Sequence, residues 1–126
     1  MASLTFISSP ELAPPGGSYS VAVATGDLVF CAGGIAVDRS GAVVGDTVAE
    51  QTAKVIDNLE IALKEAGSSL DRVVKTLCFL VDIDDFPEFN RAYAEKFGAH
   101  RPARSTVAVA GLVKGALVEI ECVAVR

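Results

Sequence analysis

A chain of 126 residues with 16 acidic and 11 basic side chains has a formal net charge of −5, and 51% of its residues are hydrophobic. This composition excludes a disordered chain, and the length predicts one domain over residues 1–126. The acidic balance argues against a nucleic-acid partner, because phosphate binding needs a basic face. The first six residues do not have the pattern of a signal peptide, and no apolar run is long enough to span a membrane. We therefore expect a cytoplasmic protein with no membrane partner.

The first third of the chain is predicted to form short strands. The cluster Pro14–Gly17 (PPGG) indicates a loop that leads into them. Ser18–Ala24 and Leu28–Ala32 are predicted strands on either side of Thr25–Asp27, where Gly-Asp favours a tight turn. A third short strand is expected at Ile35–Val37.

The first helix is predicted from its two ends and from its apolar face. Thr47 and Glu50 have the spacing of a capping box, in which each side chain bonds a free backbone N–H of the first turn. Gly67 has the position of a left-handed residue that ends a helix. Between these ends, apolar residues recur at steps of three and four, as on a helix that packs on a core.

The second helix is expected to begin at Asp84 or Asp85, with Pro87 in its first turn, and to end at Gly98. Glu88 is available to complete an N-terminal box. One face of this helix is aromatic, and its spacing favours packing on the core over stacking on a cofactor; the face consists of Phe86, Phe89, Tyr93 and Phe97.

Three further apolar runs are predicted strands, namely Arg72–Asp82, Arg104–Ala110 and Leu117–Val125. The order of elements predicts an α+β fold, a mixed sheet with two helices packed on one face. Both phases of Arg72–Asp82 are apolar, which indicates a strand that is buried on both sides. Two helices cover one face only, so we expect another copy of the chain to cover the other, in a homo-oligomer.

No familiar catalytic or metal-binding motif is present. His100 is the single histidine and is expected to be a solvated loop residue, so a metal site is not predicted. The cysteines lie far apart in apolar runs, which predicts buried free thiols; they are Cys31, Cys78 and Cys122.

The remaining candidates are charged residues in apolar strands. Arg104 follows the rigid Pro102-Ala103 pair at the start of a strand. Glu119 and Glu121 are two residues apart and therefore project from the same strand face. These charges have two interpretations. One is structural, with both glutamates at surface positions or an Arg–Glu pair that ties strands together, and the other is a functional site.

Short motifs throughout the chain resemble the RidA (YjgF/UK114-type) reactive-intermediate deaminases. The Pro-Ala-Arg-Ser string, followed at the family's distance by Glu-x-Glu, is the most specific part. The motifs are Gln51-Thr52, Asn58-Leu59, Ala66-Gly67, Val73–Thr76, Asp85-Phe86, Phe89-Asn90, Pro102–Ser105 and Val118–Glu121.

The resemblance implies a chorismate-mutase-like fold, in which three subunits surround a central barrel and a cleft lies at each interface. It implies hydrolysis of enamine and imine intermediates to 2-oxo acids and ammonia, as by a 2-iminobutanoate/2-iminopropanoate deaminase. The substrates would be 2-aminoacrylate, 2-iminopropionate and 2-iminobutyrate, and no cofactor is implied.

The resemblance also assigns roles to residues of this sequence. Arg104 matches the arginine that binds the substrate carboxylate, and Glu119 matches the acidic residue that positions and activates water. The other matches to the substrate pocket are Tyr19, Gly33 and Asn90. Thr106 shares a strand face with Arg104 by the two-residue period, which also places it in the pocket.

The sequence departs from the family's usual residues at three positions: Ala32 and Gly34 stand where many members have Ser and Gln, and Thr106 where many have Cys. The loss of polar groups around Gly33 leaves a second interpretation open, a non-catalytic sensor of carboxylate metabolites that uses the same inter-subunit cleft. Two further interpretations of the function are a protein-interaction role through apolar surface, and a chorismate-mutase-like rearrangement by analogy of fold.

Overall fold

The computed structural model describes residues 3–126, so the first two residues of the predicted domain, and part of the segment on which the signal-peptide expectation rests, lie outside it. Short 3-10 turns lie at Leu70–Arg72, Ile83–Asp85 and Val113–Gly115. The strands and helices are, in order, β1 (Thr5–Ile7), β2 (Ala22–Thr25), β3 (Leu28–Gly34), α1 (Val48–Glu65), β4 (Val73–Leu80), α2 (Phe86–Phe97), β5 (Ala103–Ala108) and β6 (Val118–Val125).

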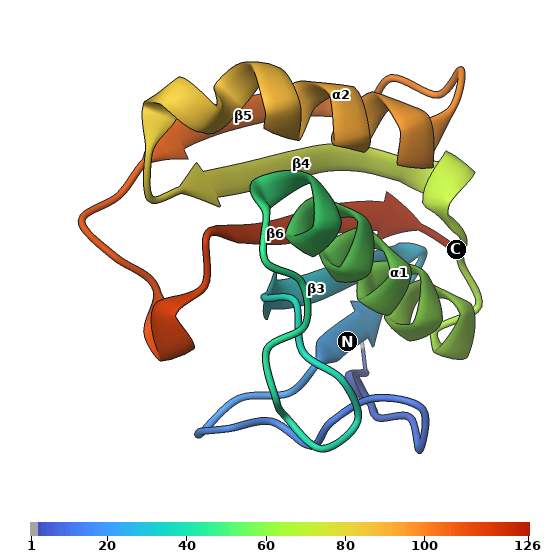
Figure 1. Cartoon of the computed structure of the whole chain (residues 1–126). Helices are drawn as coiled ribbons and strands as arrows, with labels where there is room; N and C mark the ends of the chain where they lie inside the picture. The colour runs from blue at the N-terminus through green and yellow to red at the C-terminus, as the bar shows by residue number, and fades with distance from the viewer. Residues whose placement is uncertain (1–2) are drawn as a thin grey trace.

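The strands form a six-stranded sheet in the order β1-β2-β3-β6-β4-β5. β4 and β5 pair in parallel because α2 returns the chain between them, whereas the other neighbours pair antiparallel. Both helices lie on one side of the sheet, with α1 against β3 and β6 and α2 in front of β4 and β5 (Figure 1). The predicted α+β class, with a mixed sheet and two helices on one face, is confirmed.

Helix α1 begins as its sequence predicts. The Thr47 hydroxyl accepts a hydrogen bond from the Glu50 N–H at 3.1 Å, and the Glu50 carboxylate accepts one from the Thr47 N–H at 3.2 Å. Gly67 follows the last turn with a φ of +83°, a conformation that glycine adopts without strain. The capping box and the end of the helix are therefore both confirmed.

Helix α2 begins at Phe86, with Asp85 at its N-cap and Pro87 in the first turn, and Gly98 ends it. The predicted N-terminal box through Glu88 is wrong. The Glu88 carboxylate instead accepts a hydrogen bond from the backbone N–H of Ala49 at 3.0 Å. This N–H belongs to the first turn of α1, where the helix dipole favours a negative charge, so the carboxylate ties the two helices together.

Several strand predictions are corrected by the structure. β1 (Thr5–Ile7) was not predicted, and the first half of the predicted strand Ser18–Ala24 is a loop. Ile35–Val37 is not a strand, because Val37 forms only an isolated bridge with Val43. His100 is half-buried rather than solvated, and its Nε2 lies 2.7 Å from the Val73 carbonyl oxygen.

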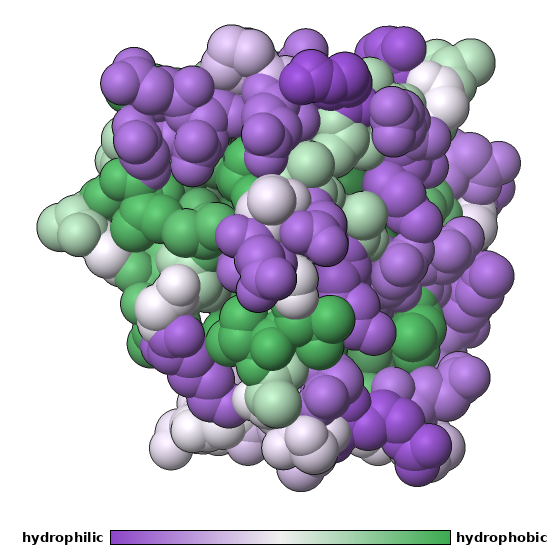
Figure 2. Space-filling view, in the orientation of Figure 1, coloured by the Kyte–Doolittle hydropathy of each residue, from purple (hydrophilic) through white to green (hydrophobic). Residues whose placement is uncertain are grey.

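The two faces of the sheet differ in what covers them. On the helix side the side chains are fully buried, among them Val29, Val55, Ile56, Leu63, Leu80 and Ile120, and the three cysteines are buried and free as predicted. On the surface of this side, hydrophilic side chains cover the top and the right of the view, and hydrophobic patches lie at the left and the lower centre (Figure 2). On the outer face, Phe6 is 66% exposed, Phe30 44% and Val107 43%. Within residues 3–126, no helix combines the length and apolar character needed to cross a membrane.

Candidate active site in two halves

Arg104 lies on β5 and faces the helix side of the sheet. Its register partner on β4 is Thr76, which is fully buried beneath the helices. The Arg104 guanidinium carbon lies 5.4, 5.5 and 4.7 Å from the ring centroids of Phe86, Phe89 and Tyr93. At these distances a cation is attracted to the ring faces, which hold the guanidinium in place without neutralising it.

The aromatic face of α2 therefore has two roles. It packs on the core as predicted, and successive rings lie 6.2, 5.6 and 4.6 Å apart along Phe86, Phe89, Tyr93 and Phe97. It also forms the surface on which Arg104 rests. The Tyr93 hydroxyl lies 2.8 Å from the Thr76 hydroxyl, and this buried hydrogen bond fixes the ring that is nearest to the guanidinium. Burial raises the pKa of Tyr93, which keeps its hydroxyl neutral.

The Arg104 guanidinium is available to a ligand. Among residues 3–126 it has no ion pair and no side-chain hydrogen bond. It borders a cavity of about 390 Å³. The cavity is lined by Asn90, Tyr93, Ala94, Arg101, Pro102 and Arg104. An unpaired guanidinium beside open space can form two parallel hydrogen bonds to a carboxylate.

Two other predicted residues lie near Arg104. Asn90 is exposed on α2 and lines the same cavity. Thr106 follows Arg104 by two residues on the same face of β5, as predicted, and its Oγ1 is buried without a hydrogen-bond partner in the described chain. Arg104, Asn90 and Thr106 form what we call the arginine half-site.

Glu119 lies on β6 and is paired with Phe79 on β4. It is half-buried, and burial followed by the negative charge of Glu121 raises its pKa above the ordinary value. Gly33 is the residue that makes room for it: a Cβ at Gly33 would lie 2.5 Å from Glu119 Oε2. No side chain larger than hydrogen fits there without moving the carboxylate.

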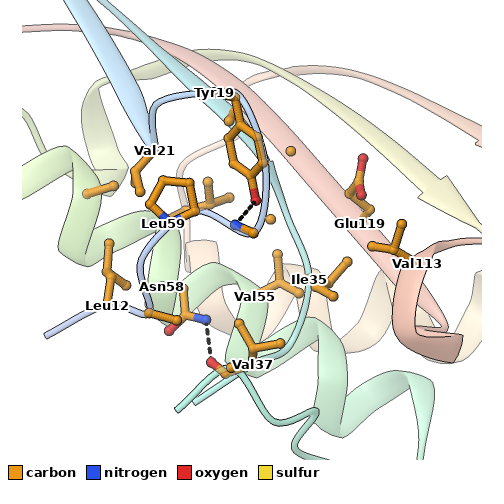
Figure 3. Close-up of a pocket in the computed structure, with 18 of the residues that line it drawn as sticks. Leu12, Tyr19, Val21, Ile35, Val37, Val55, Asn58, Leu59, Val113 and Glu119 are labelled. Atoms are coloured by element: carbon orange, nitrogen blue, oxygen red, sulfur yellow. Dashed lines mark hydrogen bonds between the residues drawn. The ribbon is translucent and has the colours of Figure 1, made fainter. Parts of the chain in front are cut away.

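Tyr19 completes this second group. The residue is 54% exposed, and its hydroxyl accepts a hydrogen bond from the Gly16 N–H at 3.2 Å. Tyr19, Gly33 and Glu119 all line a larger cavity of about 530 Å³ (Figure 3). The cavity lies at the end of β3, where the register shift between Cys31 and Gly34 interrupts the regular pairing with β6. We call these three residues the glutamate half-site.

One chain does not bring the two half-sites together. The β4 partners of Arg104 and Glu119 are Thr76 and Phe79, which are three residues apart. Because successive side chains of a strand alternate between faces, Arg104 and Glu119 project from opposite sides of the sheet. The alternative of an Arg–Glu pair that ties strands of one chain together is therefore wrong.

The sequence interpretation missed most of the larger cavity. Its wall includes Lys114, the one non-glycine residue of the described chain with a positive φ (59°), whose Nζ donates a hydrogen bond to the Gly41 carbonyl at 2.6 Å. It also includes apolar residues of α1 and of the loop around Pro14–Gly17. The breaker cluster was the only sequence signal for this loop, and it does not say what the loop covers.

Comparisons with known proteins agree over nearly the whole chain. A family model described as Endoribonuclease L-PSP matches residues 10–126. A RutC family protein of Pyrococcus abyssi is 43% identical over 118 residues, which are 92% of this chain and 93% of that protein. The structure of YyfA from Yersinia pestis, in the Rid protein family, has a TM-score of 0.94 at 34% identity and covers 98% of this chain and 100% of its own. E. coli TdcF with bound serine has a TM-score of 0.91 at 32% identity and covers 97% and 98%.

The chain therefore belongs to the Endoribonuclease L-PSP family, which is the family of the YjgF/RidA proteins. This confirms the resemblance on which the site assignments rest.

Proposed function

We propose that this protein hydrolyses reactive enamine and imine intermediates, such as 2-aminoacrylate, 2-iminopropionate and 2-iminobutyrate, to 2-oxo acids and ammonia. The observation that carries the proposal is the Arg104 guanidinium, which rests on aromatic rings beside a cavity and has no acidic partner among residues 3–126. A small organic anion supplies the charge that this site lacks. The serine bound to TdcF, a zwitterion overall, offers such a negative group, since its carboxylate lies next to a nitrogen-bearing carbon.

The proposal includes a homotrimer with a central barrel and active sites between subunits. The two half-sites lie on opposite faces of one sheet, so a complete site needs the arginine half-site of one copy and the glutamate half-site of another. The outer face also exposes large apolar side chains, among them Phe6, Phe30 and Val107. A face of this kind is typical of a protein interface.

The reaction begins when Arg104 binds the substrate carboxylate through two charge-assisted hydrogen bonds, worth ~1.5–3 kcal/mol each. This contact holds the C=N carbon beside Glu119 of the neighbouring copy, and positioning lowers the barrier. An enamine first becomes the imine by gaining a proton at carbon and losing one from nitrogen. Asn90 and Thr106 border the carboxylate-binding side, and Thr106 has a hydroxyl that is still free to bond.

Glu119 then handles the water. Its carboxylate takes a proton from water as the oxygen bonds to the imine carbon, and the proton passes to the nitrogen, which gives a carbinolamine. The carboxylate then moves the hydroxyl proton of this intermediate to the nitrogen, the C–N bond breaks, ammonia leaves and the C=O of the 2-oxo acid forms. The raised pKa of Glu119 lies closer to neutral pH than that of an ordinary carboxyl, and a group whose pKa is near the working pH is the most effective acid–base catalyst. No cofactor enters this scheme.

A second candidate is a non-catalytic sensor of carboxylate metabolites. Ala32 and Gly34 favour it, because neither contributes a polar group to the cavity wall beside Glu119. Such a module binds 2-oxo or amino acids between subunits without turning over an imine.

The test is imine hydrolysis. An amino-acid oxidase generates 2-iminopropionate in situ, and its loss is followed with the wild type, Arg104→Ala, Glu119→Gln and the control Glu65→Gln. Glu65 is an exposed carboxylate at the end of α1, outside both cavities and not among the groups that raise the pKa of Glu119. We expect rapid loss with the wild type and the control, and loss near the uncatalysed rate with the other two. Binding of pyruvate without turnover would favour the sensor, and an inactive control would contradict the assignment of Glu119.

A further inference from the structure

The larger cavity extends well beyond the glutamate half-site. In Figure 3, Glu119 and Val113 lie at one end, and Leu12 and Asn58 lie at the other, beneath the loop that carries Tyr19. Helix α1 contributes the buried side chains of Val55 and Leu59 to the wall between them.

The chemistry of the cavity changes along its length. The Glu119 carboxylate lies at one end, and the Tyr19 phenol lies between that end and Leu12 (Figure 3). The interior is formed mainly by aliphatic side chains, namely Leu12, Val21, Ile35, Val37, Val55 and Leu59.

The polar groups of the interior are already bonded. The Asn58 side-chain amide donates a hydrogen bond to the Val37 carbonyl at 2.9 Å. The Lys114 ammonium donates to the Gly41 carbonyl at 2.6 Å. Within the described part of the chain, Lys114 is the only charged residue in the wall besides Glu119. The interior therefore offers apolar surface and few free hydrogen-bonding groups, which suits a hydrocarbon group better than a polar one.

We propose that this apolar interior is a specificity pocket for the side chain of a 2-imino acid, and that the protein prefers imino acids with long or branched apolar side chains over 2-iminopropionate. The proposal rests on the proposed function, because the imine carbon beside Glu119 directs the side chain into the cavity. The volume of about 530 Å³ is far larger than a methyl group needs. Ala32 and Gly34 add no polar group to the wall that this side chain passes.

The test compares kcat/KM for imines generated by an amino-acid oxidase from alanine, norvaline, leucine and phenylalanine, after subtraction of uncatalysed hydrolysis. We expect kcat/KM to rise about four- to tenfold per added methylene up to the size of leucine. In parallel, calorimetry measures binding of pyruvate and of 4-methyl-2-oxopentanoate, and the branched acid should bind more tightly.

Filling the pocket tests its location. Val21→Phe places a ring in the apolar interior and should lower the leucine-to-alanine ratio of kcat/KM at least tenfold. Val37→Phe fills the same interior from the other side, and serves if Val21→Phe fails to fold. Val44→Phe adds the same ring at an exposed position outside the cavity wall and should leave the ratio unchanged.

The outcomes separate the two proposals. If the protein accelerates the loss of none of the imines, short or long, the proposed function is overturned. Tighter binding of the longer 2-oxo acid would in that case still support the pocket. Hydrolysis of the alanine-derived imine with equal or lower kcat/KM for the longer ones would overturn the specificity pocket alone. A ratio that Val21→Phe and Val37→Phe leave unchanged would also overturn it.

Discussion

Replacement of Arg104 has an effect that can be worked out from its surroundings. Arg104→Ala removes both hydrogen bonds to the substrate carboxylate, a loss of ~3–6 kcal/mol, which corresponds to a decrease of about 10²- to 10⁴-fold in kcat/KM. Arg104→Lys keeps the charge but not the planar fork, so one bond remains and the decrease should be about 10- to 10²-fold.

The same substitution should cost little stability. The guanidinium lies over three rings, 4.7–5.5 Å from their centroids, and such contacts contribute ~0.5–2 kcal/mol. This is small against the ~5–15 kcal/mol by which domains are usually stable, so Arg104→Ala should fold. The rings of Phe89 and Tyr93 remain held by the core, because both are almost fully buried.

The assay is kcat/KM for imine hydrolysis, with thermal unfolding and solution mass measured on the same samples. The matched control is Arg91→Ala, which removes an exposed arginine of α2 that does not line the cavity. Equal activity of Arg104→Ala and Arg91→Ala would refute the assignment of the carboxylate-binding group. An unfolded Arg104→Ala would show instead that the cation is a structural part of the aromatic cluster.

Three further predictions concern the surroundings of the two half-sites. Gly33→Ala should lower kcat about 10- to 10²-fold with the fold retained, because its Cβ would lie 2.5 Å from Glu119 Oε2. The control Gly34→Ala should be active, because its Cβ would lie 4.0 Å from its nearest neighbour, the Ile120 carbonyl oxygen. Equal kcat values for the two variants would contradict this prediction. The pKa of Glu119 is raised, so the stability that this carboxyl contributes is present below its unfolded pKa and declines as pH rises through its folded pKa. In thermal melts, Glu119→Gln should therefore be more stable than the wild type at neutral pH and equal to it below about pH 4. A variant less stable than the wild type at neutral pH would be evidence against burial as the cause of the raised pKa. Thr76→Val leaves the buried Tyr93 hydroxyl without its 2.8 Å partner and should cost about 1–3 kcal/mol in denaturant unfolding, and an unchanged midpoint would mean that the bond does not contribute.

Local signals predicted the helices well and the first strands poorly. The capping box at Thr47 and the left-handed Gly67 fix α1 through contacts within a few residues, which a sequence pattern contains. β1 (Thr5–Ile7) has three residues and exists through its pairing with β2, so no pattern of its own indicates it. The Glu88 carboxylate was assigned to its own helix because its true partner, the Ala49 N–H, is 39 positions away along the chain.

The sequence also predicted strand faces better than the shape of the site. Glu119 and Glu121 share a face as the two-residue period requires, and Thr106 shares one with Arg104. The period does not relate one strand to another, however. That Arg104 and Glu119 project from opposite sides follows only from the register of β4 with both neighbours, which depends on the whole sheet.

The proposed function requires a complete site that combines Arg104 of one copy with Glu119 of another. The most direct measurement is to mix Arg104→Ala and Glu119→Gln chains, let their subunits exchange, and assay imine hydrolysis while native mass spectrometry verifies mixed assemblies. If the site lies between copies, random mixing at equal amounts restores both residues at about a quarter of the interfaces, so two inactive proteins together should regain up to about a quarter of wild-type activity. Mixed assemblies that remain inactive would contradict the account.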